Sequence, residues 1–403
     1  MLDDPLVTDT SLPLDEKLAA LGFPEVVVSA PKAFFDGREW MLTLMDLIEN
    51  AQDYVILTSY LASESESNRE FYDLLIRRAE EGLKIYLLFD SSSTFDMTRS
   101  REYVRPLIKL REHGIHVLEF NPFSFNRLIT PSRFFLRDHR KVLVADGLYV
   151  AVGGMNLNYA STMPLSAGYS AQRDSMFLME SSSLAQLFVS QFIDFWNSYS
   201  WEPVDESTFS YRAAGSGEKQ DIRAFFLNQD NPSSGMNVKF LGSVLSSAGE
   251  EILVFPFAPL EDRNTFDAIG KAVDRGVRII MLLTNEPRRE LRNSSYYAAS
   301  FLREKGVEVF YEPDVPERAG LLHEKLMIID NRWVMVGSFN MNYRSLVLAN
   351  ETILLVDSPE FAAFMKKHFE EILDGTVYLD EETARQWRKL SNEFAYMLKK
   401  TMG

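Results

Sequence analysis

Runs of apolar residues alternate with stretches whose apolar positions recur at helical spacing, and the same order occurs twice along the chain. In the first half, the apolar run at 53–60 predicts a buried strand and the pattern at 68–82 predicts a helix that ends at a glycine. Residues 84–90 predict the next strand. The same strand, helix and strand are predicted in the second half at 251–257, 264–276 and 277–284.

Each half then continues in the same way. A further helix is predicted at 103–113 and at 295–306, and the strands that follow are predicted at 115–120 and 307–311. A Phe-rich helix closes each half, at 184–196 and 359–373. Strands that alternate with helices are typical of α/β proteins. We therefore predict two similar α/β/α sandwich domains that face each other about a pseudo-twofold axis.

The domain boundaries follow from this duplication and from turn-forming residues. A chain of 403 residues fits two domains of roughly 200 residues each. Gly-Ser-Gly and Asn-Pro-Ser-Ser-Gly are turn signals within 202–235, which we interpret as a linker. The predicted order is an N-terminal extension, a first domain, the linker and a second domain, at 1–29, 30–201, 202–235 and 236–403.

A polar motif, His-x-Lys-x4-Asp, is repeated inside this framework. An offset of 184 residues aligns the two copies without a gap, and Gly-x-x-Asn follows each copy in register. The chain contains only five histidines, so two chance copies in register are improbable. The aligned pairs are His139 with His323, Lys141 with Lys325, Asp146 with Asp330, and Asn156 with Asn340.

These residue types form an anion-binding set. His and Lys two residues apart on an extended segment share one face, where an imidazole that titrates near neutrality lies beside a fixed cation. The two asparagines lie at strand ends and can donate amide N–H groups. Ser338 can add a donor on the phosphate side, whereas its counterpart Gly154 offers only a backbone N–H. Two copies brought together would surround one phosphate.

Phosphodiester cleavage needs a nucleophile, an acid for the leaving alkoxide, and stabilisation of the charge on the phosphate oxygens. Two facing histidines can supply the first two without a metal ion. One attacks phosphorus and becomes phosphohistidine while the other protonates the leaving group. The second histidine then activates water or an acceptor alcohol.

The motifs resemble those of the phospholipase D superfamily, in which His-x-Lys-x4-Asp is followed by Gly-Ser-x-Asn or Gly-Gly-x-Asn. Over residues 30–373 the chain looks most like the bacterial cardiolipin synthase branch. The segments that carry this resemblance are Gly153-Gly-Met-Asn156, Gly337-Ser-Phe-Asn340, Arg344-Ser345 and Asn350-Glu351. The resemblance implies the phospholipase D fold, one active site at the domain interface, a covalent phosphatidyl-histidine, and no metal or organic cofactor.

The resemblance also implies a role for each site residue. Following the family's more frequent arrangement, His139 is assigned as the nucleophile and His323 as the general acid and base, although pseudo-symmetry leaves the reverse open. Asp174 and Glu351 occupy the positions of the acidic residues that orient the histidines. The residues expected to bind the phosphate are Lys141, Lys325, Asn156 and Asn340.

Asp146 and Asp330 allow two interpretations. An Asp that closes a strand before a turn is often structural. The alternative, which we favour, is a supporting role behind the histidines, without direct participation in the chemistry.

Charge and the termini bear on partners and location. The formal net charge of −16 opposes nucleic acid at long range, and the absence of cysteine excludes disulfides and thiolate chemistry. The acidic N-terminus does not resemble a signal peptide, and no stretch is long enough to span a membrane. We therefore expect a cytoplasmic protein that associates peripherally with the membrane. The Phe-rich segment 120–135, with Phe123, Phe125 and Phe134, either enters the bilayer surface or covers the core.

The expected function is that of a phosphatidyltransferase or phospholipase D that acts on a phospholipid phosphodiester, most similar to cardiolipin synthase. A nuclease or another phosphodiesterase is the alternative enzyme, opposed by the acidic charge and by the lack of a basic, aromatic-lined groove. A non-catalytic protein that binds lipid or protein is a further alternative, opposed by the two complete motifs. Because the duplication supplies both half-sites, a monomer is sufficient. The head group and the acceptor stay open.

Overall fold

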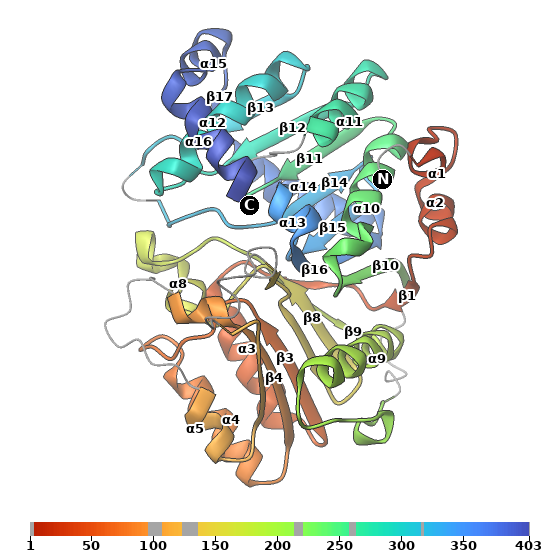
Figure 1. Cartoon of the computed structure of the whole chain (residues 1–403), viewed down its shortest axis with the longest axis vertical. Helices are drawn as coiled ribbons and strands as arrows, with labels where there is room; N and C mark the ends of the chain where they lie inside the picture. The colour runs from red at the N-terminus through yellow and green to blue at the C-terminus, as the bar shows by residue number, and fades with distance from the viewer. Residues whose placement is uncertain are drawn as a thin grey trace.

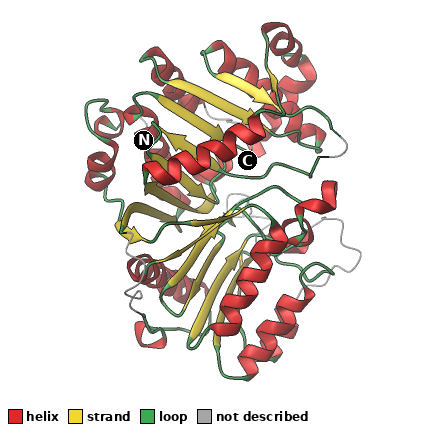
Figure 2. Ribbon diagram, turned by 180° about the vertical axis from the view of Figure 1, so that it is seen from behind, coloured by secondary structure: helices red, strands yellow, loops and turns green. Residues whose placement is uncertain are grey.

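Two β-sheets lie one above the other along the long axis of the molecule, each covered by helices (Figure 1). The computed structural model describes residues 4–95, 107–122, 136–212, 221–257, 263–315 and 318–402. Seen from behind, the same two layered halves meet along a broad interface (Figure 2). The predicted pair of α/β domains is confirmed.

The first sheet has seven strands and carries the first motif. Three strands that follow one another through helices are parallel, and the remaining neighbours are antiparallel. In spatial order the strands are β2 (Lys32–Phe34), β9 (Met176–Glu180), β8 (Tyr149–Gly153), β7 (Val142–Ala145), β3 (Tyr54–Ser59), β4 (Lys84–Asp90) and β5 (His116–Phe120). The outer face is covered by α3 (Gly37–Asn50), α4 (Arg69–Glu80) and α5 (Leu107–Glu112).

The second sheet has ten strands. In order along its main path they are β1 (Glu25–Val28), β10 (Ile222–Gln229), β16 (Ala349–Asp357), β15 (Trp333–Gly337), β14 (Leu326–Ile329), β11 (Glu251–Phe255), β12 (Arg278–Leu283), β13 (Glu308–Tyr311) and β17 (Val377–Tyr378). The tenth, β6 (Arg137–Asp138), pairs with β16. The outer face packs against α2 (Leu14–Ala20), α10 (Met236–Ser247), α11 (Arg263–Asp274), α12 (Arg289–Glu304) and α15 (Glu381–Trp387).

Part of the predicted linker is a strand of the second sheet. β10 pairs antiparallel with both β1 and β16, and its side chains are buried from Ala224 onward. Turn signals stand on both sides of this short apolar run in the sequence, and long-range pairing makes the run a strand. The linker interpretation was therefore wrong for 222–229, and the extension at 1–29 contributes β1 to the same sheet.

The two closing Phe-rich helices join the domains. They are α9 (Ser182–Tyr199) and α14 (Pro359–Leu373), and both belong to one apolar core that includes strands of both sheets. Phe177 of the first domain, for example, meets Phe361 of the second edge to face, with ring centroids 5.8 Å apart. A shared core of this kind fixes the domains relative to each other, as a site built from both requires.

Two sequence expectations concern the membrane. The Phe residues at 123, 125 and 134, expected either to enter the bilayer surface or to cover the core, lie outside the described residues. Within the described ranges, no helix combines the length and the apolar character needed to cross a bilayer.

Candidate active site

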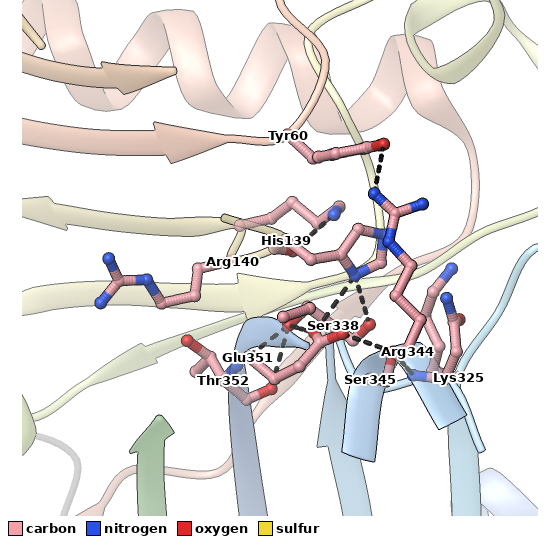
Figure 3. A network of polar contacts seen from close by, with 12 residues as sticks. Tyr60, His139, Arg140, Lys325, Ser338, Arg344, Ser345, Glu351 and Thr352 are labelled. Atoms are coloured by element: carbon pink, nitrogen blue, oxygen red, sulfur yellow. Dashed lines mark hydrogen bonds and ion pairs between the residues drawn. The ribbon is translucent and has the colours of Figure 1, made fainter. Parts of the chain in front are cut away.

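The first motif is held in place by the other domain. β6 runs parallel to β16, with Arg137 opposite Ala349 and Asp138 opposite Asn350. The backbone N–H of His139 then donates to the carbonyl of Asn350 at 2.9 Å. This register brings the His139 imidazole to Glu351: its Nδ1 lies 3.1 Å from Glu351 Oε2 and 3.0 Å from the Ser338 carbonyl (Figure 3).

The second motif is held in the reciprocal way. Arg173 of the first domain forms a parallel bridge with Leu322, and the His323 N–H donates to the Arg173 carbonyl at 2.7 Å. The next residue, Asp174, places its Oδ2 2.5 Å from Nδ1 of His323. Each histidine is therefore oriented by a carboxylate from the opposite domain. Nδ1 is occupied in both rings, and among the described residues Nε2 of neither ring forms a hydrogen bond or ion pair.

Both Nε2 atoms can serve one cavity, which has a volume of about 760 Å³ and is lined by both domains. Of the residues predicted from the motifs, those that line it are His139, His323, Asn156, Asn340 and Glu351. The amide oxygen of Asn156 accepts the Leu61 N–H at 3.1 Å, which leaves its NH2 group to donate. The amide oxygen of Asn340 is buried and has no hydrogen-bond partner among the described residues.

The two lysines lie behind the histidines instead of facing the cavity. Lys141 Nζ donates to the His139 carbonyl at 2.6 Å, and Lys325 Nζ donates to the His323 carbonyl. Lys325 Nζ is also 2.7 Å from His323 Nδ1 and 3.6 Å from Asp174. Neither lysine lines the cavity, and their contact with phosphate stays a prediction. Besides burial, their positive charge lowers the pKa values of the two histidines.

Ser338 also takes a role other than the predicted one. It is fully buried, its hydroxyl donates to Glu351, and it accepts the Thr352 N–H at 2.9 Å. Glu351 accepts a second hydroxyl bond, from Ser345, at 2.6 Å. Ser338 therefore holds the carboxylate that orients His139, and it does not line the cavity as a phosphate-side donor.

Asp146 and Asp330 anchor turns. Asp146 accepts the backbone N–H groups of Gln52, Asp53 and Tyr54 at 2.8–3.2 Å. Asp330 accepts the corresponding three N–H groups at 249–251, at 2.8–2.9 Å. Neither lines the cavity, and both have positive φ, of 51° and 52°. These contacts correct the favoured supporting role: each Asp ties its turn to the start of a neighbouring strand.

Burial dominates the electrostatics of the site. It raises the pKa of Glu351 to about 7 and, with the charge of Lys325, lowers the pKa of His323 to about 3. Burial and then Lys141 hold the pKa of His139 well below its usual range. Burial opposes ionisation of Asp174, but Lys325 and His323 outweigh it, so its pKa is below the ordinary value. In the unliganded site at neutral pH, both imidazoles are neutral and Asp174 is ionised.

The residue pairs that orient the two histidines differ by one hydroxymethyl group and one methylene. A Cβ at Gly154 would overlap the Asp174 carboxylate, so only glycine fits there. In the other half, the longer Glu351 leaves room for Ser338 at the matching position and accepts its hydroxyl. A Gly–Asp pair thus serves His323, and a Ser–Glu pair serves His139.

Two aromatic residues of the site were not anticipated. Tyr60 packs edge-on against His139 with ring centroids 4.9 Å apart, and Phe257 packs likewise against His323 at 4.2 Å. Lys141 and Lys325 lie 5.3 and 4.9 Å from the same two ring centroids. The sequence did contain a signal for these two residues. Tyr60 and Phe257 follow the equivalent strands β3 and β11, so they occupy corresponding positions in the two halves.

Comparison with known proteins identifies the family. The sequence profile described as "Cardiolipin synthase, PLD-like domain" matches residues 44–196 and 241–373, one copy in each half. The chain belongs to the phospholipase D superfamily. Within this superfamily it is similar to a cardiolipin synthase of Staphylococcus aureus, 26% identical over 367 residues, covering 89% of this chain and 70% of that protein. It is also similar to the cardiolipin synthase of Alkalihalophilus pseudofirmus, 23% identical, covering 79% of this chain and 60% of that protein.

Several of these superfamily members are longer than this chain. The matches span 60–67% of the length of the cardiolipin synthases from A. pseudofirmus and Bacillus anthracis. Among solved structures, the phosphatidylserine synthase of Haemophilus influenzae superimposes with a TM-score of 0.69 at 16% identity, covering 97% of this chain and 99% of that one. That likeness establishes the fold over the full chain.

Proposed function

We propose that the protein is a phosphatidyltransferase that transfers a phosphatidyl group through a covalent phosphohistidine, as a cardiolipin synthase would. One observation carries the proposal: two histidines from opposite domains, each held at Nδ1 by a carboxylate, line one cavity. Nucleophile and acid then lie on opposite sides of a bound phosphodiester, as in-line displacement requires. The names of the cardiolipin synthases similar to this chain support a phospholipid substrate.

In the proposed reaction, His139 Nε2 attacks phosphorus while the bond to the leaving alkoxide breaks. His323 donates the proton that the alkoxide takes up. His323 then removes a proton from the acceptor hydroxyl, whose oxygen attacks phosphorus and releases His139. Asn156 and Asn340 line the cavity and can donate to the phosphate oxygens.

The two carboxylates support this division of roles. Asp174 stays ionised, so it favours a protonated His323 once an anionic phosphodiester arrives on the other side of the ring. Glu351 has a pKa of about 7 and already accepts two hydroxyl bonds, so it is the weaker partner for an imidazolium. A neutral His139 with Nδ1–H directed to Glu351 keeps the Nε2 lone pair available for attack.

The test of activity uses phosphatidylglycerol vesicles and, separately, phosphatidylethanolamine vesicles, with products identified by mass spectrometry. We expect phosphatidylglycerol vesicles to yield cardiolipin and glycerol. We expect neither product with His139→Ala or with His323→Ala. His113→Ala is the matched control, because His113 is exposed and pairs with Glu80 outside the cavity. Phosphatidic acid alone would indicate hydrolysis, and no reaction with any phospholipid would overturn the proposal.

The nucleophile is tested by trapping. In His323→Ala, a labelled phosphatidyl ester of p-nitrophenol, whose leaving group needs no acid, is expected to leave its phosphatidyl group on His139, because the base for the second step is missing. In His139→Ala no labelled histidine is expected. Peptide mapping that found the label on His323 in the His139→Ala variant would reverse the two roles.

We further propose that the protein reaches its substrate as a peripheral membrane protein, through α16 (Leu390–Met402). This helix runs antiparallel to α12: Arg388, just before it, contacts Ser300, and Tyr396 packs near Tyr297. Its C-terminal end thus points toward the start of α12, beside the cavity-lining Leu291. Four large apolar side chains on it are exposed: Leu390, Phe394, Met397 and Leu398.

Such an amphipathic helix can enter the interfacial layer of a bilayer next to the cavity. In vesicle flotation, the Leu390→Gln/Phe394→Gln variant is expected to lose most of its bound fraction. Leu42→Gln is the control, because Leu42 is also exposed but lies on α3 of the other domain. Equal flotation of all three proteins would exclude α16 as the contact.

A further inference from the structure

One of the arginines that line the cavity forms no ion pair with a carboxylate of the described residues. Four arginines line the cavity: Arg173, Arg288, Arg318 and Arg344. Arg173 and Arg318 both bind Glu312, at 2.6 and 2.8 Å, and Arg288 binds Glu286 at 2.7 Å. For Arg344, no described carboxylate lies within ion-pair distance, and its hydrogen bond goes to the Tyr60 hydroxyl at 3.1 Å.

Arg344 lies beside the proposed nucleophile. Its side chain extends from α13 (Tyr343–Val347) past the His139 ring to Tyr60 (Figure 3). The guanidinium carbon is 5.6 Å from the centroid of the Tyr60 ring, and that ring packs on His139 at 4.9 Å. Arg344 is also one of the positive charges that depress the pKa of His139. A phosphate within reach of His139 would therefore be close to this guanidinium.

In the structure the lysines of the motifs point to backbone carbonyls, whereas Arg344 lines the cavity. Lys141 and Lys325 donate to the carbonyls of their own histidines, and neither lines the cavity. An arginine has the advantage of a planar fork of N–H donors that matches two phosphate oxygens.

Arg344 also breaks the pseudo-symmetry of the site. The offset that superimposes the two motifs places Ala160 at the corresponding position of the first half, and Ala160 lines the cavity too. The extra cation therefore serves one side of the cavity, next to His139.

We propose that Arg344 binds a non-bridging oxygen of the phosphate held at His139, and that the Tyr60 hydroxyl positions its guanidinium. The inference rests on the proposed function for the identity of the ligand as a phospholipid phosphodiester. The binding chemistry is the same for free inorganic phosphate. Binding and turnover are therefore measured separately.

The binding experiment titrates inorganic phosphate into the full chain by calorimetry. Arg344→Gln is expected to weaken binding at least ten-fold, the loss typical of a removed charged hydrogen bond. Arg344→Lys is expected to recover part of it. Arg385→Gln is the control, because it removes the same charge from an exposed position on α15, outside the cavity. Melting temperatures identify any variant that does not fold, and in that case Arg344→Lys carries the comparison.

The turnover experiment uses phosphatidylglycerol vesicles. Arg344→Ala is expected to lose at least ten-fold in kcat/KM and to regain activity when guanidinium ion is added at millimolar concentration, a rescue that a merely structural role would not allow. Tyr60→Phe is expected to raise KM and weaken phosphate binding about three-fold, without lowering the melting temperature.

The outcomes separate the two proposals. If Arg344→Gln weakens phosphate binding but the wild-type protein turns over no phospholipid, the proposed function fails and this inference stands. If Arg344→Gln and Arg385→Gln bind phosphate as the wild type does, the inference is wrong. It is wrong as well if the wild type does not bind phosphate at tens of millimolar.

Discussion

His323 and Asp174 belong to different domains, yet Nδ1 of the histidine lies 2.5 Å from Oδ2 of the carboxylate. The reciprocal pair, His139 and Glu351, is separated by 3.1 Å. Each motif therefore receives its orienting carboxylate from the other half of the duplicated chain. A single half would carry a histidine without its partner, and the shared apolar core holds the two halves in the arrangement that supplies it.

The crossed pairs predict distinct kinetic defects. Asp174→Asn removes the charge that favours a protonated His323, so we expect the single-turnover rate of leaving-group release to fall about 100-fold. Glu351→Gln keeps an oxygen that accepts from Nδ1 of His139, so the expected loss is about ten-fold. Rapid-quench measurement of the released alcohol makes the comparison, with the exposed Glu381→Gln as control. A larger defect in Glu351→Gln than in Asp174→Asn would contradict the assignment of roles.

The pairing of Gly154 with Asp174 predicts a rescue. Gly154→Ser places a side chain where the Asp174 carboxylate lies, so we expect it to reduce kcat at least ten-fold. Adding Asp174→Glu would rebuild the Ser–Glu pair of the other half and is expected to restore part of the activity. Steady-state kinetics of the single and double variants test this. A double variant less active than Gly154→Ser alone would show that the pairs are not interchangeable.

The two turn-anchoring aspartates are expected to affect stability instead of chemistry. Asp146 is buried and binds three backbone N–H groups, so Asp146→Ala should lower the free energy of unfolding by about 3 kcal/mol. Asp330→Ala should cost about 1 kcal/mol, because two of its three donors are exposed. Urea unfolding gives both values. If the folded variants had a kcat far below that of the wild type, Asp146 and Asp330 would have a supporting role at the active site after all.

Glu351 predicts a pH dependence of stability. Its pKa is raised from 4.5 to about 7 in the folded protein, so the folded state binds its proton more tightly than the unfolded state. The contribution is fully present below pH 4.5 and is lost as the pH rises through about 7. The stability advantage of the wild type over Glu351→Gln should therefore shrink between about pH 5 and pH 8, with a steepest slope of about 1.4 kcal/mol per pH unit. Urea unfolding across this range measures that slope, and an unchanged difference would mean that Glu351 is already ionised at the acidic end.

The sequence by itself predicted the duplication and the chemistry of the motifs. Spacing along the chain carries that information, because two copies in register leave little room for chance and because periodic apolar positions predict strands and helices locally. His139, His323, Asn156 and Asn340 accordingly all line one cavity.

Only the tertiary structure decided how those residues act on one another. The contact of His139 with Glu351 depends on β6 pairing with β16, and that of His323 with Asp174 depends on the bridge between the two domains at Arg173. The place of β10 in the second sheet depends on its pairing with β1 and β16. Such contacts join residues more than a hundred positions apart, and local periodicity does not encode them. The inward-turned lysines and the turn-bound aspartates have a related cause: identical side chains bind whichever buried backbone groups the fold leaves without partners, and only the assembled core determines which those are.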